Sequence, residues 1–438
     1  MLDSNTIFDT KEIDKKDAIK QLEKLIGECN IIEKIWRLRY FNDEPKFPLF
    51  GGKIRDTKNI SDAGEADRLV SGLGMTEDRA KIKTLGEAVE RFCLAVYRKK
   101  DFIYGSHKEI KNSINPLSFA TFDNETLKKQ NIMFSDFNEN TKFNWVKGVN
   151  LSTLREAFIP AHMVYIPYNF ENEKVIQFPI TNGAAAGTSF TGAIYRGICE
   201  LIERDAFMIN YLNKLPAKKI IVDDIDNVHI QDMIYKFKNY RLEPYLFLLE
   251  TDLNVPTVLT ILVDKTGIGP SISLGLRSGF DIEENIISSM EEAQQSRPWL
   301  RKEILKKNEM NEKQNIKTIL DRGLFWFDVK MIKELNYLLK SDRKISISSL
   351  KYKKKLSLKD IIKNLKNNNI NSFFVDITQP EIKKIGFTVV KVICPELQPL
   401  FFDEDFKIIS NRVFTVPEKI GFKKLSLDKL NNVPHPFL

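Results

Sequence analysis

Apolar residues recur at every third or fourth position in two long stretches of the chain, and this spacing is typical of amphipathic helices. The first stretch follows Gly72 and Gly74, and Thr76 is its expected N-cap because a threonine hydroxyl can accept a hydrogen bond from the first turn. The second follows a segment rich in alanine, glycine and threonine, residues 181–190, which we interpret as a loop. The expected buried stripes comprise Ile82, Leu85, Val89, Cys93 and Val96 in the first helix and Ile194, Ile198, Leu201, Ile202 and Met208 in the second.

Alternating or β-branched stretches predict strands in other parts of the chain. These stretches span residues 143–168, 244–264, 270–280, 372–378 and 387–395. A third helix is expected over 281–300 and should end near Pro298, because proline cannot donate the backbone hydrogen bond that continues a helix. The segment 28–41 fits either a strand or a short helix. Residues 301–370 are rich in lysine and asparagine, and we interpret them as a helical or loop insert.

The first two expected helices share the motif E-x-x-E-R at the same distance from a glycine. Glu87 lies thirteen residues after Gly74, as Glu200 does after Gly187. The rest of the two motifs comprises Glu90, Arg91, Glu203 and Arg204. Residues three apart project from the same side of a helix. A solvated face with weak surface ion pairs is one interpretation; the matched glycines favour two similar elements that face one site.

Carboxylates that converge from two helices would suit a hard divalent cation. Mg²⁺ takes oxygen ligands and is usually held by a few carboxylates together with water and substrate phosphates. Neighbouring arginines could then contact phosphate oxygens in a forked geometry, and a small-residue segment lets backbone N–H groups approach a phosphate closely. The chain has no Walker A and no kinase-type G-x-G-x-x-G sequence, so a nucleotide site here would lie outside those motifs.

Composition changes this picture little. Of the 438 residues, 42% are hydrophobic, which is enough for a sizeable core, and the formal charge of +8 suits an acidic partner such as a nucleotide. Lysine-rich surfaces are common without such a partner. The four cysteines form no C-x-x-C pair and no zinc pattern with histidine. The N-terminal residues lack the apolar segment of a secretory signal, and no apolar run reaches the ~20 residues that span a bilayer, so we expect a cytoplasmic protein without a membrane partner.

Four ordered blocks of the sequence resemble successive blocks of the YcaO family. They cover residues 71–92, 181–207, 271–297 and 373–400. The resemblance implies a mixed α/β fold in which β-sheets and flanking helices surround a central ATP site. It also implies one domain over 61–438, preceded by an N-terminal segment of residues 1–60 and ending in a proline-containing tail at 431–438.

The same resemblance implies roles for individual residues. Mg²⁺ would be held by Glu87, Glu90, Glu200 and Glu203. ATP would be contacted by Lys83, Arg91, Asn182, Thr188, Arg204, Gln295 and Arg297. Many relatives carry Gly-Lys-Gly where this chain has Gly72-Leu73-Gly74, and a serine where it has Lys83. A lysine near the phosphates would therefore be lost at position 73 or supplied by Lys83.

The last five residues read P-x-P-x-Leu, one proline short of the P-x-P-x-P ending found in azoline-forming relatives. A frayed terminus is the plain interpretation. The resemblance implies instead that the tail reaches the active site, where Pro434, Pro436 and Leu438 would act and the terminal carboxylate would assist proton transfer. His435 is a further candidate base, although an isolated histidine, such as His107, is more often a surface or core residue.

The implied reaction is ATP-dependent cyclodehydration of a ribosomally made precursor peptide, as in bacteriocin maturation. A Cys, Ser or Thr side chain attacks the preceding amide, the amide oxygen takes the γ-phosphoryl group, and loss of phosphate leaves a thiazoline or (methyl)oxazoline. The chain is similar to the stand-alone D-protein type, of SagD or McbD kind, so we expect a separate E1-like protein that binds the leader peptide. An FMN-dependent dehydrogenase and a homodimer are compatible with this role, and nucleic acid is not an expected partner.

Two other functions stay open at this point. One is a different YcaO reaction, the formation of a thioamide or an amidine. The other is a non-enzymatic, basic binding protein that uses the lysine-rich residues 301–370, although such runs are usually solvated faces. Salt-sensitive nucleic-acid binding without ATP turnover would favour the second.

Overall fold

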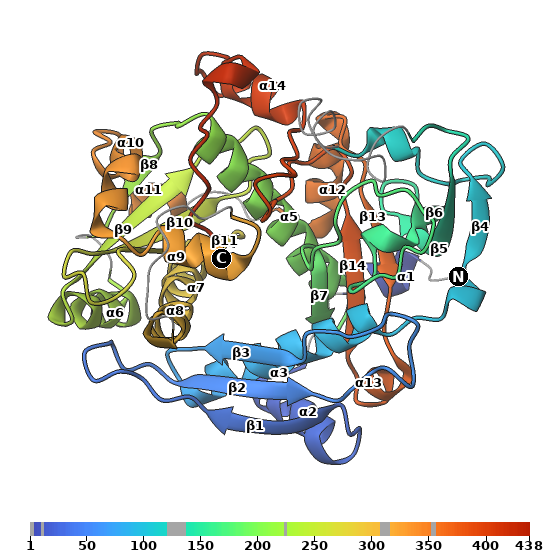
Figure 1. Cartoon of the computed structure of the whole chain (residues 1–438), viewed down its shortest axis with the longest axis horizontal. Helices are drawn as coiled ribbons and strands as arrows, with labels where there is room; N and C mark the ends of the chain where they lie inside the picture. The colour runs from blue at the N-terminus through green and yellow to red at the C-terminus, as the bar shows by residue number, and fades with distance from the viewer. Residues whose placement is uncertain (1–3, 10–12, 121–136, 223–225, 307–315, 352–355) are drawn as a thin grey trace. The chain divides into compact units, whose positions relative to one another are not determined.

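The computed structural model describes residues 4–9, 13–120, 137–222, 226–306, 316–351 and 356–438. The chain divides into two compact units, each assembled from segments that are far apart in the sequence. Unit 1 comprises residues 1–38, 48–201 and 357–397, and unit 2 comprises residues 39–47, 202–356 and 398–438. The strands of the described residues form three sheets, two of them in unit 1 and one in unit 2 (Figure 1).

The smaller sheet of unit 1 is antiparallel and carries strands β1 (Ile32–Arg37), β2 (Leu49–Ile54) and β3 (Leu69–Leu73) in that order. The undecided segment 28–41 therefore contains a strand. Helices α2 (Lys15–Gly27) and α3 (Glu77–Ala95) pack on this sheet and on each other (Figure 1). Helix α3 begins as predicted, because the Thr76 side chain accepts a hydrogen bond from the backbone N–H of Arg79.

Two glycines let α3 lie unusually close to β3. A Cβ atom at Gly72 would be 2.5 Å from the backbone nitrogen of Thr84, and one at Gly74 would be 2.5 Å from that of Ala80. A larger residue at either position would push the helix away from the strand. The glycines of the sequence motif therefore set the distance between β3 and the glutamates of α3.

The larger sheet of unit 1 has the strand order β4-β5-β13-β14-β7, and β6 pairs with β5. All pairings in it are antiparallel. Its strands are β4 (Ile103–Ser106), β5 (Lys142–Asn150), β6 (Glu156–Pro160), β7 (Ala184–Gly187), β13 (Phe373–Asp376) and β14 (Thr388–Ile393). The strands expected within 143–168, 372–378 and 387–395 are confirmed.

The expectation of a loop over residues 181–190 is wrong for its central part, because Ala184–Gly187 forms strand β7 on the edge of this sheet. Alanine and glycine have low strand propensity, so no pattern in the segment indicates a strand. Its backbone is nevertheless paired with β14. Helix α5 (Phe190–Leu212) follows β7, and its residues from Ile202 onward belong to unit 2.

The sheet of unit 2 has the strand order β11-β10-β9-β8-β12, in which only the β8–β12 pairing is parallel within the described residues. Its strands are β8 (Lys218–Ile221), β9 (Leu242–Leu249), β10 (Thr257–Asp264), β11 (Ile272–Ser278) and β12 (Lys344–Ser346). Helix α7 (Ile282–Gln295) packs on β10 and β11, and α6 (Val228–Asn239) packs on β9. The strands and the third helix predicted for this region are confirmed, and Pro298 lies in the first turn of the next helix, α8 (Arg297–Lys306).

The described part of the lysine- and asparagine-rich segment 301–370 is mostly helical and also contributes the edge strand β12. Residues 307–315 and 352–355 of this segment lie outside the described residues. Its further elements are α9 (Ile319–Phe325), the 3₁₀ helix η4 (Val329–Leu335), α10 (Asn336–Leu339), α11 (Ile347–Lys351) and α12 (Leu358–Asn367). Of these elements, α12 belongs to unit 1 and the others belong to unit 2.

Short helices complete the described chain. They are α1 (Ser4–Ile7), α13 (Pro380–Lys384), α14 (Arg412–Lys419) and the 3₁₀ helices η1 (Lys99–Asp101), η2 (Pro116–Ser118), η3 (Ala161–Met163) and η5 (Leu427–Lys429). After η5 the chain runs alongside α9 to the C-terminus (Figure 1). None of the helices in the described ranges is long and apolar enough to cross a membrane.

Candidate nucleotide site

Three strands lie at the edges of their sheets, and each precedes a long helix: β3 precedes α3, β7 precedes α5 and β11 precedes α7. The outward N–H groups of an edge strand have no strand partner. In or beside these strands, such groups donate to glutamate carboxylates on the helices. The donor–acceptor distances are 3.1 Å from Ser71 to Glu87, 2.7 Å from Ala186 to Glu90, 2.9 Å from Gly183 to Glu200, 2.8 Å from Ser278 to Glu203 and 2.6 Å from Leu276 to Glu292.

The spacing of three within each motif has a structural reason. The first glutamate of a helix binds the strand that precedes that helix, as Glu87 binds β3 and Glu200 binds the residue before β7. The second binds the strand that precedes the next long helix, as Glu90 binds β7 and Glu203 binds β11. The interpretation as a solvated face does not fit, because Glu203 is only 4% exposed and each of the four carboxylates is held by the backbone.

Carboxylates in unit 1 are crowded. Burial raises the pKa of Glu90 to about 8, and the charges of Glu200 and Glu87 act in the same direction. Burial also raises the pKa of Glu87, although Arg91 lies 2.8 Å away and opposes this change. Arg196, which donates to the carbonyl oxygen of Ala186, offsets part of the charge at Glu90. Ionised carboxylates here would repel one another, so Glu90 holds its proton more tightly than usual. A divalent cation would relieve that repulsion.

In unit 2, Arg204 is buried beside two carboxylates. Its Nη1 atom lies 3.2 Å from Oε1 of Glu203, and its Nη2 atom lies 3.7 Å from Oε1 of Glu292. The guanidinium carbon also lies 4.0 Å from the centre of the Phe437 ring, a cation–π geometry. Glu203, Arg204 and Glu292 thus form a fixed group, and the C-terminal tail covers one side of its arginine.

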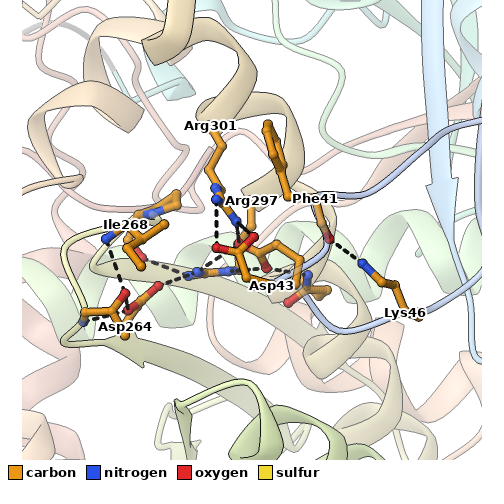
Figure 2. Close-up of polar contacts among 11 residues, drawn as sticks. Phe41, Asp43, Lys46, Asp264, Ile268, Arg297 and Arg301 are labelled. Atoms are coloured by element: carbon orange, nitrogen blue, oxygen red, sulfur yellow. Dashed lines mark hydrogen bonds and ion pairs between the residues drawn. The ribbon is translucent and has the colours of Figure 1, made fainter.

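Arg297, which the family resemblance assigns to phosphate binding, lies in a buried ion cluster (Figure 2). It is 1% exposed and donates to Glu44, Asp264 and the carbonyl oxygen of Pro270, with distances of 2.7 Å to Asp264 and 2.8 Å to Pro270. Glu44 also accepts from Arg301 at 3.2 Å. In this arrangement Arg297 anchors the segment 39–47 to α8, and contact with a phosphate would require it to leave these partners.

The C-terminal tail is part of the fold of unit 2 and is not frayed. The Tyr211 hydroxyl and the Trp326 indole donate to the carbonyl oxygen of Pro434, at 3.1 and 2.8 Å. Arg322, which is fully buried on α9, donates to the carbonyl oxygen of His435 at 2.8 Å. Pro436 is buried and Leu438 is partly exposed. The tail therefore keeps a defined path to the last residue.

His435 serves this path as a packing residue. It is 2% exposed, its Nε2–H donates to the carbonyl oxygen of Phe401 at 2.8 Å, and aromatic rings including Phe207 and Tyr211 surround it. Burial lowers the pKa of His435 well below its usual value, and the nearby charge of Arg322 acts in the same direction. The imidazole is therefore neutral, and its enclosure separates it from a substrate.

The sequence matches the model of a family described as YcaO cyclodehydratase, ATP- and Mg²⁺-binding, over residues 71–398, which is most of the chain. The chain belongs to the YcaO family. Its members are described as binding ATP and Mg²⁺. Solved structures confirm the mixed α/β fold expected from the resemblance. A curated relative, an uncharacterized protein of Methanothermobacter thermautotrophicus, is 25% identical over 343 residues, which cover 77% of this chain and 83% of the relative.

Solved structures with the same fold include a heterocyclase in complex with substrate and cofactor, with a TM-score of 0.79, 20% identity and coverage of 100% of this chain. YcaO from Methanopyrus kandleri, bound with AMPPCP and Mg²⁺, has a TM-score of 0.66, 16% identity and coverage of 91% of this chain and 94% of its own. The chain spans 59% of the length of the first heterocyclase and 51% of that of the heterocyclase TruD.

The residues of this YcaO protein fit ATP and Mg²⁺ in two respects. Asn182 is 8% exposed, and its Nδ2 atom has no hydrogen-bond partner among the described residues, so a donor stands ready next to the Gly183–Glu200 contact. Across those residues, no three Asp, Glu, His or Cys side chains form a complete metal site by themselves. The second respect is the crowding of carboxylates around Glu90, because Mg²⁺ is usually held by one or two carboxylates together with nucleotide phosphates.

The other predicted ATP contacts are placed as follows. Arg91 forms ion pairs of 2.8 Å with Glu87 and Asp67. Thr188 lies between β7 and α5, and Gln295 is the last residue of α7. Lys83 lies on α3, one turn before Glu87, and all three of Lys83, Thr188 and Gln295 are partly exposed. Glu292 and Gln295 repeat the spacing of three on the third helix, with glutamine in place of the second glutamate.

Sequence reasoning missed three residues that shape these groups: Glu292, Arg322 and Lys391. Glu292 could have been found from its place on the helix that follows β11, but it lacks the E-x-x-E-R motif. Lys391 interrupts the apolar run of β14 and is 3% exposed, so a charged residue inside a predicted strand was the available signal. Arg322 had no comparable signal, because its partners are the tail and residues 401–404.

Proposed function

We propose that this YcaO protein uses ATP and Mg²⁺ to cyclodehydrate Cys, Ser or Thr residues of a ribosomally made precursor peptide. The magnesium ions would be held by Glu87, Glu90, Glu200 and Glu203. The observation that carries the proposal is that a backbone N–H orients one oxygen of each glutamate, which is how ligating carboxylates are usually supported. The family of the chain and its likeness to heterocyclase structures support the same function.

The chemistry follows from the poor leaving ability of an amide oxygen. The peptide nucleophile would add to the carbonyl carbon and lose its proton, and the resulting oxyanion would take the γ-phosphoryl group with release of ADP. Departure of phosphate with that oxygen, and of the amide proton, would leave the C=N bond of the azoline. Bound Mg²⁺ would neutralise phosphate charge in such a site. Arg204 would donate to phosphate oxygens, and the tail residues Pro434, Pro436 and Leu438 would assist the reaction.

A separate E1-like protein would present the leader peptide, and an FMN-dependent dehydrogenase could act on the product. The solved E. coli structures with the same fold are of a microcin synthetase complex, McbBCD, one of them with pro-MccB17 bound, with TM-scores of 0.60 and 0.57. They support a peptide substrate and partner proteins for this chain. We therefore expect little ring formation from the purified protein, ATP and precursor peptide when the partner is omitted.

The test is to change Glu90 and Glu200 separately to Gln, which keeps the shape and removes the charge. Phosphate release from ATP in the presence of precursor peptide and partner should fall by roughly a hundredfold or more in each variant. The peptide should lose one water per ring with the wild type and none with the variants, as read by mass spectrometry. Sulfur incorporation instead of water loss would point to thioamide formation.

Glu77→Gln is the matched control, because Glu77 lies on α3, the helix of Glu90, and is exposed in an ion pair with Arg37. It should retain wild-type turnover. Equal activity of wild type, Glu90→Gln and Glu200→Gln would rule out a metal role for these glutamates.

A further inference from the structure

Lys391 is a charged residue in the interior of a sheet. It lies on β14, paired on one side with Ala184 of β7 and on the other with Val375 of β13, and it is 3% exposed. Lysine is almost never fully buried unless its charge is compensated. Here the Nζ atom donates to the carbonyl oxygens of Ile180 and Asn182, each at 2.6 Å. The compensation therefore comes from the loop that leads into β7.

One peptide group connects Lys391 to a predicted metal ligand. The carbonyl oxygen of Asn182 accepts from Lys391, and the N–H of Gly183, in the same peptide, donates to Glu200 at 2.9 Å. Because a trans peptide is planar, its C=O and N–H point in opposite directions, and fixing one fixes the other. A positive charge at the carbonyl end also polarises the peptide and strengthens the hydrogen bond at the N–H end.

The neighbouring contacts allow this peptide few other orientations. Gly183 has a φ angle of +83°, and a Cβ atom there would lie 2.3 Å from the carbonyl oxygen of Val392, so glycine is required. The carbonyl oxygen of Gly183 in turn accepts from the N–H of Val392 at 2.7 Å. The same loop carries the buried Nδ2 atom of Asn182. Burial lowers the pKa of Lys391 to about 8, and the charge of Glu200 opposes this change, in keeping with their proximity.

We infer that Lys391 is a positioning residue of the nucleotide site, which holds Glu200 and Asn182 in place through the single peptide that joins residues 182 and 183. Lys391 itself would touch neither the metal ion nor the nucleotide. Because this assignment rests on the proposed ATP site, wild-type binding of Mg²⁺-ATP has to be established first in the same experiment. If the wild type does not bind Mg²⁺-ATP, the proposed function itself is contradicted, whatever the role of Lys391.

The experiment compares Lys391→Met, Lys391→Gln and Lys391→Arg in the full-length protein, with Mg²⁺-ATP affinity measured by calorimetry and folding by thermal unfolding. Met removes the charge and the donors, Gln keeps a donor without the charge, and Arg keeps both. Positioning predicts that Kd rises by roughly tenfold in the Met variant, less in the Gln variant and least in the Arg variant. If Lys391 only balanced the charge of Glu200, its removal would instead lower Kd, with tighter Mg²⁺ binding in the Met and Gln variants. That result would overturn the inference.

Val389→Ala is the matched structural control, because Val389 is fully buried on the same strand and pairs with Ala186. It should lower the unfolding temperature without a change in Kd, whereas a change in Kd as large as that of Lys391→Met would overturn the inference. Should Lys391→Met fail to fold, Lys391→Gln carries the comparison. In a double-mutant cycle, Asn182→Ala and Lys391→Gln should be non-additive, because they act through one peptide; additive losses would contradict the shared route.

Discussion

At the scale of single residues, the surroundings of Glu87 and Glu90 disfavour the charged forms of their carboxylates. Each accepts a backbone N–H, yet Glu90 remains close enough to other carboxylates for its pKa to rise to about 8. If these residues served stability alone, glutamine would give a more stable protein, because it removes the repulsion between charges. The metal-free protein therefore carries strain that a bound cation would release.

Glu90→Gln should consequently stabilise the metal-free protein while it abolishes function. The folded-state pKa of Glu90 is raised above the unfolded value of 4.5, so the wild type loses stability as pH rises from about 4.5 to about 8. The Gln variant lacks this loss. Its unfolding temperature in EDTA should exceed that of the wild type by a margin that grows between pH 5 and pH 8, reaching roughly 2–4 °C. A margin that shrinks with rising pH would contradict the crowding of charges.

At the scale of elements, one strand–helix arrangement recurs in β3–α3, β7–α5 and β11–α7, and glutamates on the helices satisfy the strand edges. The sequence predicts α3 and α5 from apolar spacing, and their glutamates from the repeated motif. Strand β7 escapes prediction because its residues are alanine and glycine, which favour no strand pattern. The hydrogen bonds also escape it, because Glu90 and Ala186 are 96 positions apart.

The ion cluster around Arg297 gives an element-scale prediction for the attachment of segment 39–47. Glu44 is 1% exposed and accepts from Arg297, Arg301 and Gln294, so Glu44→Gln leaves buried charge uncompensated. We expect a loss of about 3–5 kcal/mol in the free energy of unfolding, measured with urea. Figure 2 shows Asp43 in the same cluster, where it pairs with Arg301.

Asp43→Asn is the matched control for this loss. The Asp43 side chain is 50% exposed, so breaking its ion pair with Arg301 should cost less than about 1 kcal/mol. Similar losses in the Glu44 and Asp43 variants would mean that burial of the charge does not determine the stability of the cluster.

At the scale of the whole chain, each unit is built from segments that are hundreds of positions apart, and this limits what the sequence can predict. The resemblance places Arg297 in an ATP-binding block. No local pattern predicts that Arg297 donates hydrogen bonds to Glu44, which lies 253 positions away. His435 is likewise a plausible base in the sequence and a buried packing residue in the fold. The sequence therefore predicts helices and the motif residues they carry, but not the contacts that distant segments make with those residues.

The last residues of the chain show this dependence and give the final prediction. Phe437 is 3% exposed and packs its ring on Arg204, while Trp326 donates to Pro434 within the same tail. Phe437→Ala removes the cation–π contact and most of the buried apolar surface at the end of the tail. Because a terminal segment can undock without global unfolding, we expect the docked population of the tail to fall more than the overall stability does.

Undocking can be followed at Trp326, one of four tryptophans in the chain. In protein labelled with 5-fluorotryptophan, the ¹⁹F resonance of Trp326 is the one that disappears in Trp326→Phe. This resonance should shift in Phe437→Ala. It should stay in place in the control Leu438→Ala, since Leu438 is partly exposed. ATP turnover should also fall in Phe437→Ala, because Arg204 loses the ring that fixes its guanidinium. A shifted resonance with full turnover would separate the tail from catalysis, and an unshifted resonance would show that Arg322, Tyr211 and Trp326 hold the tail without Phe437.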